Sequence, residues 1–209
     1  MIDNTLNAAN PVISNYGDFY VLINQLNLMI SHTESTDLLD ASTKNYYLGE
    51  AYGLRAYVYF HLLRSWGDVV LQLDYTNGNS IDIGNPSKAA SSAADVMTQI
   101  KKDIQVQKMP LVMNYSFKYG KCYWSKAATM MLKGEVYLWS GKQMNGGESD
   151  YTTAKNALMA VKTAGVGLLN DFKKVFAYDN KENDEIIFAI HNGRNEYTSG
   201  MTNIDQRWS

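Results

Sequence analysis

One stretch of this chain, residues 43–66, constrains the fold more than any other. Its apolar residues recur every three or four positions and form two separate stripes: Tyr47, Ala51, Leu54, Val58 and Leu62 in one, and Tyr52, Tyr59, Leu63 and Trp66 in the other. A helix with two apolar stripes must contact neighbours on more than one side. We therefore expect a long central helix that ends at Gly67, because glycine readily takes the left-handed conformation that follows a helix.

Four further helices are predicted from the same periodicity. The first runs over 16–30 and is expected to end at the polar residues 31–37. The second begins after a cap at Ser91 or Ser92 and ends before Pro110, the third runs over 124–140, and the fourth begins after a cap at Asp150. Gly134 lies inside the helix over 124–140, at a cost of roughly 1 kcal/mol relative to alanine. This placement indicates close approach by a neighbouring helix.

Signals for strands are weaker than signals for helices. Residues 69–73 and 186–190 are short apolar runs, and 186–190 is the better strand candidate. Residues 77–92 are rich in Asn, Gly and Ser and predict a long surface loop. The expected fold class is mainly α, with tetratricopeptide-like stacked helix pairs, long loops and one or two short strands. We expect a single helical domain over residues 1–209.

Composition and spacing exclude several kinds of site. The net charge is −2 without a basic stripe, so the electrostatic footprint of nucleic-acid binding is missing. The single cysteine, Cys122, excludes an internal disulfide and a cysteine-based zinc site, and we interpret it as a small core residue. The histidines His32, His61 and His191 have no partner at metal-ligand spacing, and His61 is best interpreted as a packed helix residue. We predict no metal and no cofactor.

Two carboxylates come nearest to a catalytic setting. Glu50 and Glu135 lie on helices with apolar stripes, but a carboxylate that bonds an arginine or a backbone group is the favoured interpretation of both. An acidic cluster at Asp179, Glu182, Asp184 and Glu185 lacks the spacing of a calcium loop and predicts a solvated turn. We therefore predict that the chain is not an enzyme, with a helical glycoside-processing enzyme as a weaker alternative.

Several aromatic residues lie in expected loops: Tyr75, Tyr115, Tyr119, Tyr197 and Trp208. Exposed aromatic rings stack on sugar rings as well as on bases, and without a basic groove the sugar is the better partner. Packing of each ring under its own loop is an equally good interpretation.

The central helix closely resembles the signature helix of the SusD/RagB family. Residues 50–69 match the family pattern E-A-x-x-L-R-A-x-x-Y-F-x-L-x-R-x-[FWY]-G-D-V-P and depart from it at Val70, where the family has proline. Residues 183–188 resemble its N-x-E-I-I-F motif, and the pair over 124–162 resembles its tetratricopeptide-like unit. The resemblance extends over roughly residues 16–190.

The resemblance to this family implies a function for the chain. Such proteins are surface lipoproteins of the outer membrane of Bacteroidetes-type bacteria that capture glycans or peptides for import through a TonB-dependent transporter. This chain has no lipoprotein signal and no run of ~20 apolar residues that could cross a bilayer. Family members are longer, so we expect a fragment of a longer protein that lacks the signal, the lipid anchor and the C-terminal part.

The residues that would contact an oligosaccharide or polysaccharide are expected in loops that flank the helices. Arg194, Tyr197 and Trp208 are the candidates, although no family motif supports them one by one. The competing hypothesis is a tetratricopeptide-like scaffold that binds another protein and no sugar.

Overall fold

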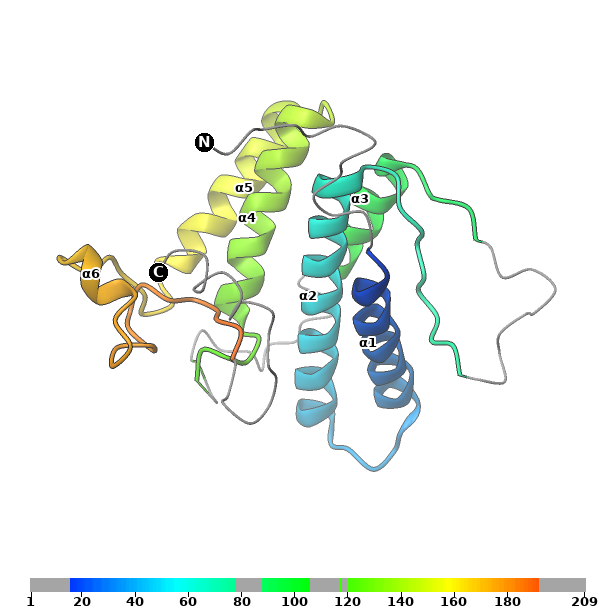
Figure 1. Cartoon of the computed structure of the whole chain (residues 1–209), viewed down its shortest axis with the longest axis horizontal. Helices are drawn as coiled ribbons and strands as arrows, with labels where there is room; N and C mark the ends of the chain where they lie inside the picture. The colour runs from blue at the N-terminus through cyan, green and yellow to red at the C-terminus, as the bar shows by residue number, and fades with distance from the viewer. Residues whose placement is uncertain (1–15, 78–87, 106–116, 118–119, 192–209) are drawn as a thin grey trace, which may run out of the picture.

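The chain folds around one long helix with a shorter helix or a helix pair on each side. A computed structural model describes residues 16–77, 88–105, 117 and 120–191. The helices in this part are α1 (Gly17–Ser35), α2 (Ala41–Trp66), α3 (Ala93–Asp103), α4 (Lys126–Gln143), α5 (Gly147–Val161) and α6 (Phe172–Val175). Figure 1 shows α2 in the middle, α1 alongside it, and the α4–α5 pair on its other side. The predicted mainly α fold is confirmed.

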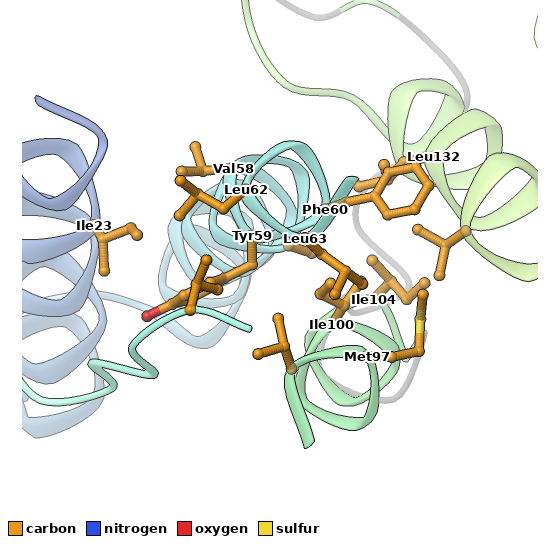
Figure 2. Close-up of a cluster of buried hydrophobic side chains, with 14 of the residues drawn as sticks. Ile23, Val58, Tyr59, Phe60, Leu62, Leu63, Met97, Ile100, Ile104 and Leu132 are labelled. Atoms are coloured by element: carbon orange, nitrogen blue, oxygen red, sulfur yellow. The ribbon is translucent and has the colours of Figure 1, made fainter. Parts of the chain in front are cut away.

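The two apolar stripes of α2 account for this central position. Figure 2 shows Ile23 of α1 pointing toward Val58, whereas Phe60 on the opposite side of α2 points toward Leu132 of α4. Ile100 of α3 lies in the same cluster and is fully buried. Burial of each such side chain stabilises the fold by about 1.5–3 kcal/mol, so α2 holds its neighbours on both sides mainly through apolar contact.

Both ends of α2 follow from local chemistry. Asp40 caps the first turn, where its carboxylate accepts the N–H of Thr43 at 3.0 Å. The helix thus begins two residues earlier than the periodicity indicates. At the other end Gly67 has φ of 76°, which confirms the predicted stop, since a residue with a Cβ is strained in that conformation.

Helix α1 is longer than the sequence predicts. The expected break at residues 31–37 is wrong for most of that stretch, because α1 continues to Ser35. Thr33 is buried, and the carboxylate of Glu34 accepts a hydrogen bond from the hydroxyl of Tyr52 at 2.8 Å. Polar residues therefore continue this helix because α2 supplies partners for them.

The α4–α5 pair confirms one prediction and corrects another. A Cβ added at Gly134 would collide with Leu158 of α5, so the predicted close approach is confirmed. Asp150 is not the cap of α5, since that helix begins earlier, after Gly146. The Asp150 carboxylate instead forms an ion pair with Lys101 of α3 at 2.7 Å. A charged partner on another helix thus determines the position of this aspartate.

Extended segments take the place of the expected strands. In the part of the chain that the structure describes, the one β-bridge outside the helices is the isolated antiparallel pair of Val69 and Ser91. Residues 186–190 form no strand there, and the N–H of Ala189 donates instead to the carbonyl of Lys121 at 2.9 Å. This apolar run is therefore held by single backbone hydrogen bonds and by packing of Ile187 and Phe188 against the core, without a strand ladder. None of the described helices is long and apolar enough to span a membrane.

Candidate functional site

A buried arginine links the three helices on one side of the molecule. Arg55 of α2 is only 4% exposed. Its Nε and Nη2 atoms each donate to the Asp103 carboxylate of α3 at 2.8 Å, and its Nη1 donates to the Asn27 side-chain oxygen of α1 at 2.9 Å. Asp103 is therefore the ion-pair partner of Arg55.

The charges in this network satisfy each other. Asp103 accepts a third hydrogen bond from the side-chain nitrogen of Gln99 at 2.7 Å. Burial by itself lowers the pKa of Arg55, but the hydrogen bonds to Asp103 and its negative charge outweigh burial, and the pKa is raised. The hydrogen bonds of both charged groups are therefore used within the protein, where they hold α2 and α3 together.

The same helices hold the extended segment that follows Gly67. The Tyr59 hydroxyl donates to the carbonyl of Gln72 at 2.9 Å and accepts its N–H at 2.8 Å. Asn27 also donates to that carbonyl at 2.9 Å. Further along, the Asn24 side chain accepts the N–H of Thr76 at 2.7 Å and donates to its carbonyl at 3.1 Å. Side-chain amides and hydroxyls thus act as the missing strand partner.

A hollow of about 620 Å³ lies beside this network, between α1, α2, α3 and the extended segment. We name it the polar hollow. The Arg55–Asp103 pair lines it, and its other polar lining groups include Glu34, Tyr52 and Lys102. Sugars are bound in such concave sites by a few well-placed polar groups. The polar hollow is therefore our candidate ligand site.

One loop aromatic that the sequence singled out lines the polar hollow. Tyr75 is half-buried there, and its ring lies 5.8 Å from the ring of His32, centroid to centroid. A second tyrosine, Tyr52, presents its hydroxyl to Glu34 at the same hollow. The sequence reasoning missed Glu34 because it assigned the end of α1 to a polar break. Continuing the helical spacing beyond Ile30 is the signal that could have found it.

The two carboxylates considered for catalysis have different surroundings. Glu50 is half-buried and accepts the backbone N–H of Trp124 at 3.4 Å, which confirms the structural interpretation. Burial raises the pKa of Glu50. Glu135 is exposed on α4 and forms no ion pair with any described residue, so the partner expected for it is not found there. The structure therefore gives Glu50 a backbone partner and leaves the Glu135 side chain at the surface of α4.

Other predicted site residues have mixed outcomes. Arg194, Tyr197 and Trp208 lie outside the described residues, as do Tyr115 and Tyr119. The cluster at residues 179–185 is a largely exposed turn, as predicted. His61 packs against Phe19, with ring centroids 5.1 Å apart, and Cys122 is half-buried. No group of three metal-ligating side chains occurs among residues that the structure describes.

Comparisons with known proteins agree on one family. A family model for SusD-like proteins, described as starch-binding and associating with the outer membrane, matches residues 2–138. The structure of NanU from B. fragilis is 60% identical, with a TM-score of 0.80, over 88% of this chain and 36% of that chain. A SusD-like protein of Bacteroides ovatus is 27% identical over 84% of this chain and 32% of its own length.

One further structure is described with a bound ligand. It was solved with a xylogluco-oligosaccharide and is 27% identical, with a TM-score of 0.70, over 84% of this chain and 34% of that chain. The present chain thus spans about a third of the length of these relatives.

Proposed function

The chain belongs to the SusD-like family of starch-binding proteins that associate with the outer membrane, and we propose that it takes part in non-catalytic capture of glycans at the cell surface. The captured glycan passes to a TonB-dependent transporter in the outer membrane. A lipid anchor holds the whole protein at the surface. The relative solved with a xylogluco-oligosaccharide supports an oligosaccharide as the ligand.

The observation that carries this proposal is the polar hollow. Its walls come from three helices that Arg55 joins through Asp103 of α3 and Asn27 of α1, so the helices that form the walls are held together before a ligand arrives. Glu34 and Lys102 supply hydrogen-bonding groups for sugar hydroxyls, and the ring of Tyr75 supplies an apolar surface. A preformed site of this kind binds without first ordering its own side chains.

The same geometry favours binding over catalysis. A general acid or base needs a pKa near the working pH and access to the substrate. Arg55 and Asp103 neutralise each other in the wall of the hollow. Glu50 has a raised pKa, but its carboxylate is bonded to the backbone of Trp124. The ion pair supports the wall of the polar hollow, and Glu50 is not among the residues that line it. We therefore expect a bound glycan to stay chemically unchanged.

Calorimetric titration against a panel of plant and host oligosaccharides tests the glycan proposal. We expect one class to bind, and we expect Glu34→Gln and Tyr75→Ala each to raise Kd about tenfold, since each removes one hydrogen-bonding or stacking group. Glu148→Gln, an exposed carboxylate in the first turn of α5, is the matched control and should leave Kd unchanged. Equal binding by all three variants would place the ligand elsewhere.

The transporter step needs a separate measurement. We expect a tagged form of the protein to co-purify with a TonB-dependent transporter from outer membranes, and Glu34→Gln to leave that complex intact. A complex with the transporter, together with no binding to any glycan of the panel, would favour the scaffold hypothesis. Hydrolysis of an oligosaccharide during the titration would overturn the non-catalytic part of the proposal.

A further inference from the structure

A second hollow, on the other side of α2, has a different lining from the first. It has a volume of about 340 Å³ and lies between α2, α4 and residues 185–188. We name it the aromatic hollow. Tyr57, Trp124 and Phe188 line it. The ring centroids of Tyr57 and Trp124 are 5.9 Å apart, and those of Trp124 and Phe188 are 5.1 Å apart.

The walls of the aromatic hollow are fixed in place. Trp124 is 3% exposed and its indole N–H donates to the Thr129 hydroxyl at 2.8 Å, which fixes the ring orientation. Figure 1 shows the segment after α6 returning toward the N-terminal end of α4. The ring of Phe188 in this segment packs against the ring of Trp124. There the Glu185 carboxylate accepts the N–H of Leu169 at 2.9 Å. The hollow is therefore a built feature of the fold.

Two carboxylates complete the lining. Glu135 of α4 lines the hollow together with Met131 and Leu132, which lie one helical turn before it. Glu185 lies three residues before Phe188 in the extended segment. Neither carboxylate forms an ion pair with a described residue. Aromatic rings with two uncompensated negative charges create a negative potential inside an otherwise apolar site.

We propose that the aromatic hollow binds a small organic cation of the alkylammonium class. The faces of Tyr57 and Phe188 attract the positive charge through their quadrupoles and contact the alkyl groups. Glu135 balances the charge at the more exposed edge, since its side chain is open to solvent. Tyr57 is 38% exposed, so one wall of the hollow is accessible from solution.

Other ligand classes fit the aromatic hollow less well. A neutral apolar molecule would lie against the half-buried carboxylate of Glu185 without supplying a partner for its charge, which is unfavourable. An anion would be repelled by both carboxylates. A neutral sugar brings no positive charge to balance the two carboxylates. The remaining walls offer its hydroxyls no further polar side chain, since they come from Ala128, Met131, Leu132, Ile186 and Ile187. The lining thus selects for positive charge combined with apolar bulk, and this inference does not rest on glycan binding at the polar hollow.

Titration of choline into the protein, followed by calorimetry, tests the proposal. The matched ligand is 3,3-dimethyl-1-butanol, which has the shape of choline without its charge. We expect choline to bind and the neutral analogue to bind at least about tenfold more weakly. Equal affinity for the two ligands would overturn the proposal in favour of a purely apolar cavity. Absence of choline binding would overturn it as well.

Substitutions in the lining of the aromatic hollow test whether choline binds there. We expect Tyr57→Ala and Glu135→Gln each to raise the Kd for choline about fivefold or more, and Tyr57→Phe to retain binding because it keeps the ring. Glu34→Gln at the polar hollow is the control and should leave the Kd for choline unchanged. Circular dichroism of each variant checks that the helices persist. Unchanged affinity in folded Tyr57→Ala and Glu135→Gln variants would show that choline binds elsewhere.

Discussion

The two hollows on either side of α2 have opposite chemistry, although one helix contributes to both. At the polar hollow α2 presents Tyr52 and Arg55, and the buried arginine is paired with Asp103. At the aromatic hollow it presents Tyr57, and the carboxylates have no cationic partner among the described residues. The Arg55–Asp103 pair is a buried charge pair that supports the fold, and the groups left for a ligand beside it, Glu34 and Lys102, carry opposite charges. The charged groups that line the aromatic hollow are both carboxylates, so the two hollows differ in the charge that they offer a ligand.

Removal of Asp103 from the buried Arg55–Asp103 pair should have the largest effect on stability. We expect Asp103→Ala to destabilise the protein by about 3–5 kcal/mol, because Arg55 stays buried without a partner. Urea unfolding measures the change, and the exposed Glu135→Ala variant should stay within about 0.5 kcal/mol of the parent. The combined variant Arg55→Met with Asp103→Leu should recover part of the loss. Similar stabilities for Asp103→Ala and Glu135→Ala would contradict the distinction.

The structure around the aromatic hollow is stabilised by packing of Trp124 and by the hydrogen bond from its indole N–H to Thr129. Trp124→Phe leaves a smaller ring and removes the donor to Thr129, whose hydroxyl is fully buried. We expect a loss of about 1–3 kcal/mol in the free energy of unfolding. Thermal unfolding followed by circular dichroism measures it. If the loss exceeded that of Asp103→Ala, packing at the aromatic hollow would outweigh the ion pair in importance.

The extended segment beside the polar hollow depends on α1. Asn24→Ala removes both hydrogen bonds to the backbone of Thr76 at a partly solvent-exposed site. We expect a loss of about 1 kcal/mol in stability, with faster amide exchange at residues 70–76. Amide exchange at Ile100 in α3 serves as the internal control. Uniformly faster exchange in both places would indicate global destabilisation.

The smallest expected effect is pH-dependent and concerns Glu50. Burial raises the pKa of this carboxyl in the folded state above its unfolded value, so its ionisation at neutral pH opposes folding. Glu50→Gln should therefore stabilise the protein at pH 7 by about 0.5 kcal/mol or less. The gain should fade as the pH falls through the raised pKa, because the parent then becomes neutral too. A gain that persists at pH 3 would assign it to packing.

Much of the fold was predictable because it depends on local periodicity. Most of α2, its stop at Gly67, a serine cap for α3 and the close approach at Gly134 all follow from short-range rules. The misassigned elements depend on distant partners. Residues 31–35 are helical because α2 offers Tyr52 as a partner for Glu34, and Asp150 faces Lys101 of another helix. Neither partner can be identified from spacing along the chain.

The candidate sites were less predictable than the fold. Tyr75 was singled out as a loop aromatic, but its neighbours at the polar hollow come from three helices that only folding brings together. The aromatic hollow likewise joins Tyr57 with Phe188, which are far apart in sequence. A hollow is defined by side chains from separate segments, so no local pattern encodes it.

The sequence by itself determined the helical architecture, the central place of α2 and, through its signature, the family. Apolar periodicity and capping residues act over three or four positions, and that range is visible in the printed chain. Only the tertiary structure decided that Arg55 pairs with Asp103 and that Glu135 remains without a partner within the described residues. Charge pairing depends on distances across the fold, and those distances arise when α2 packs against its neighbours.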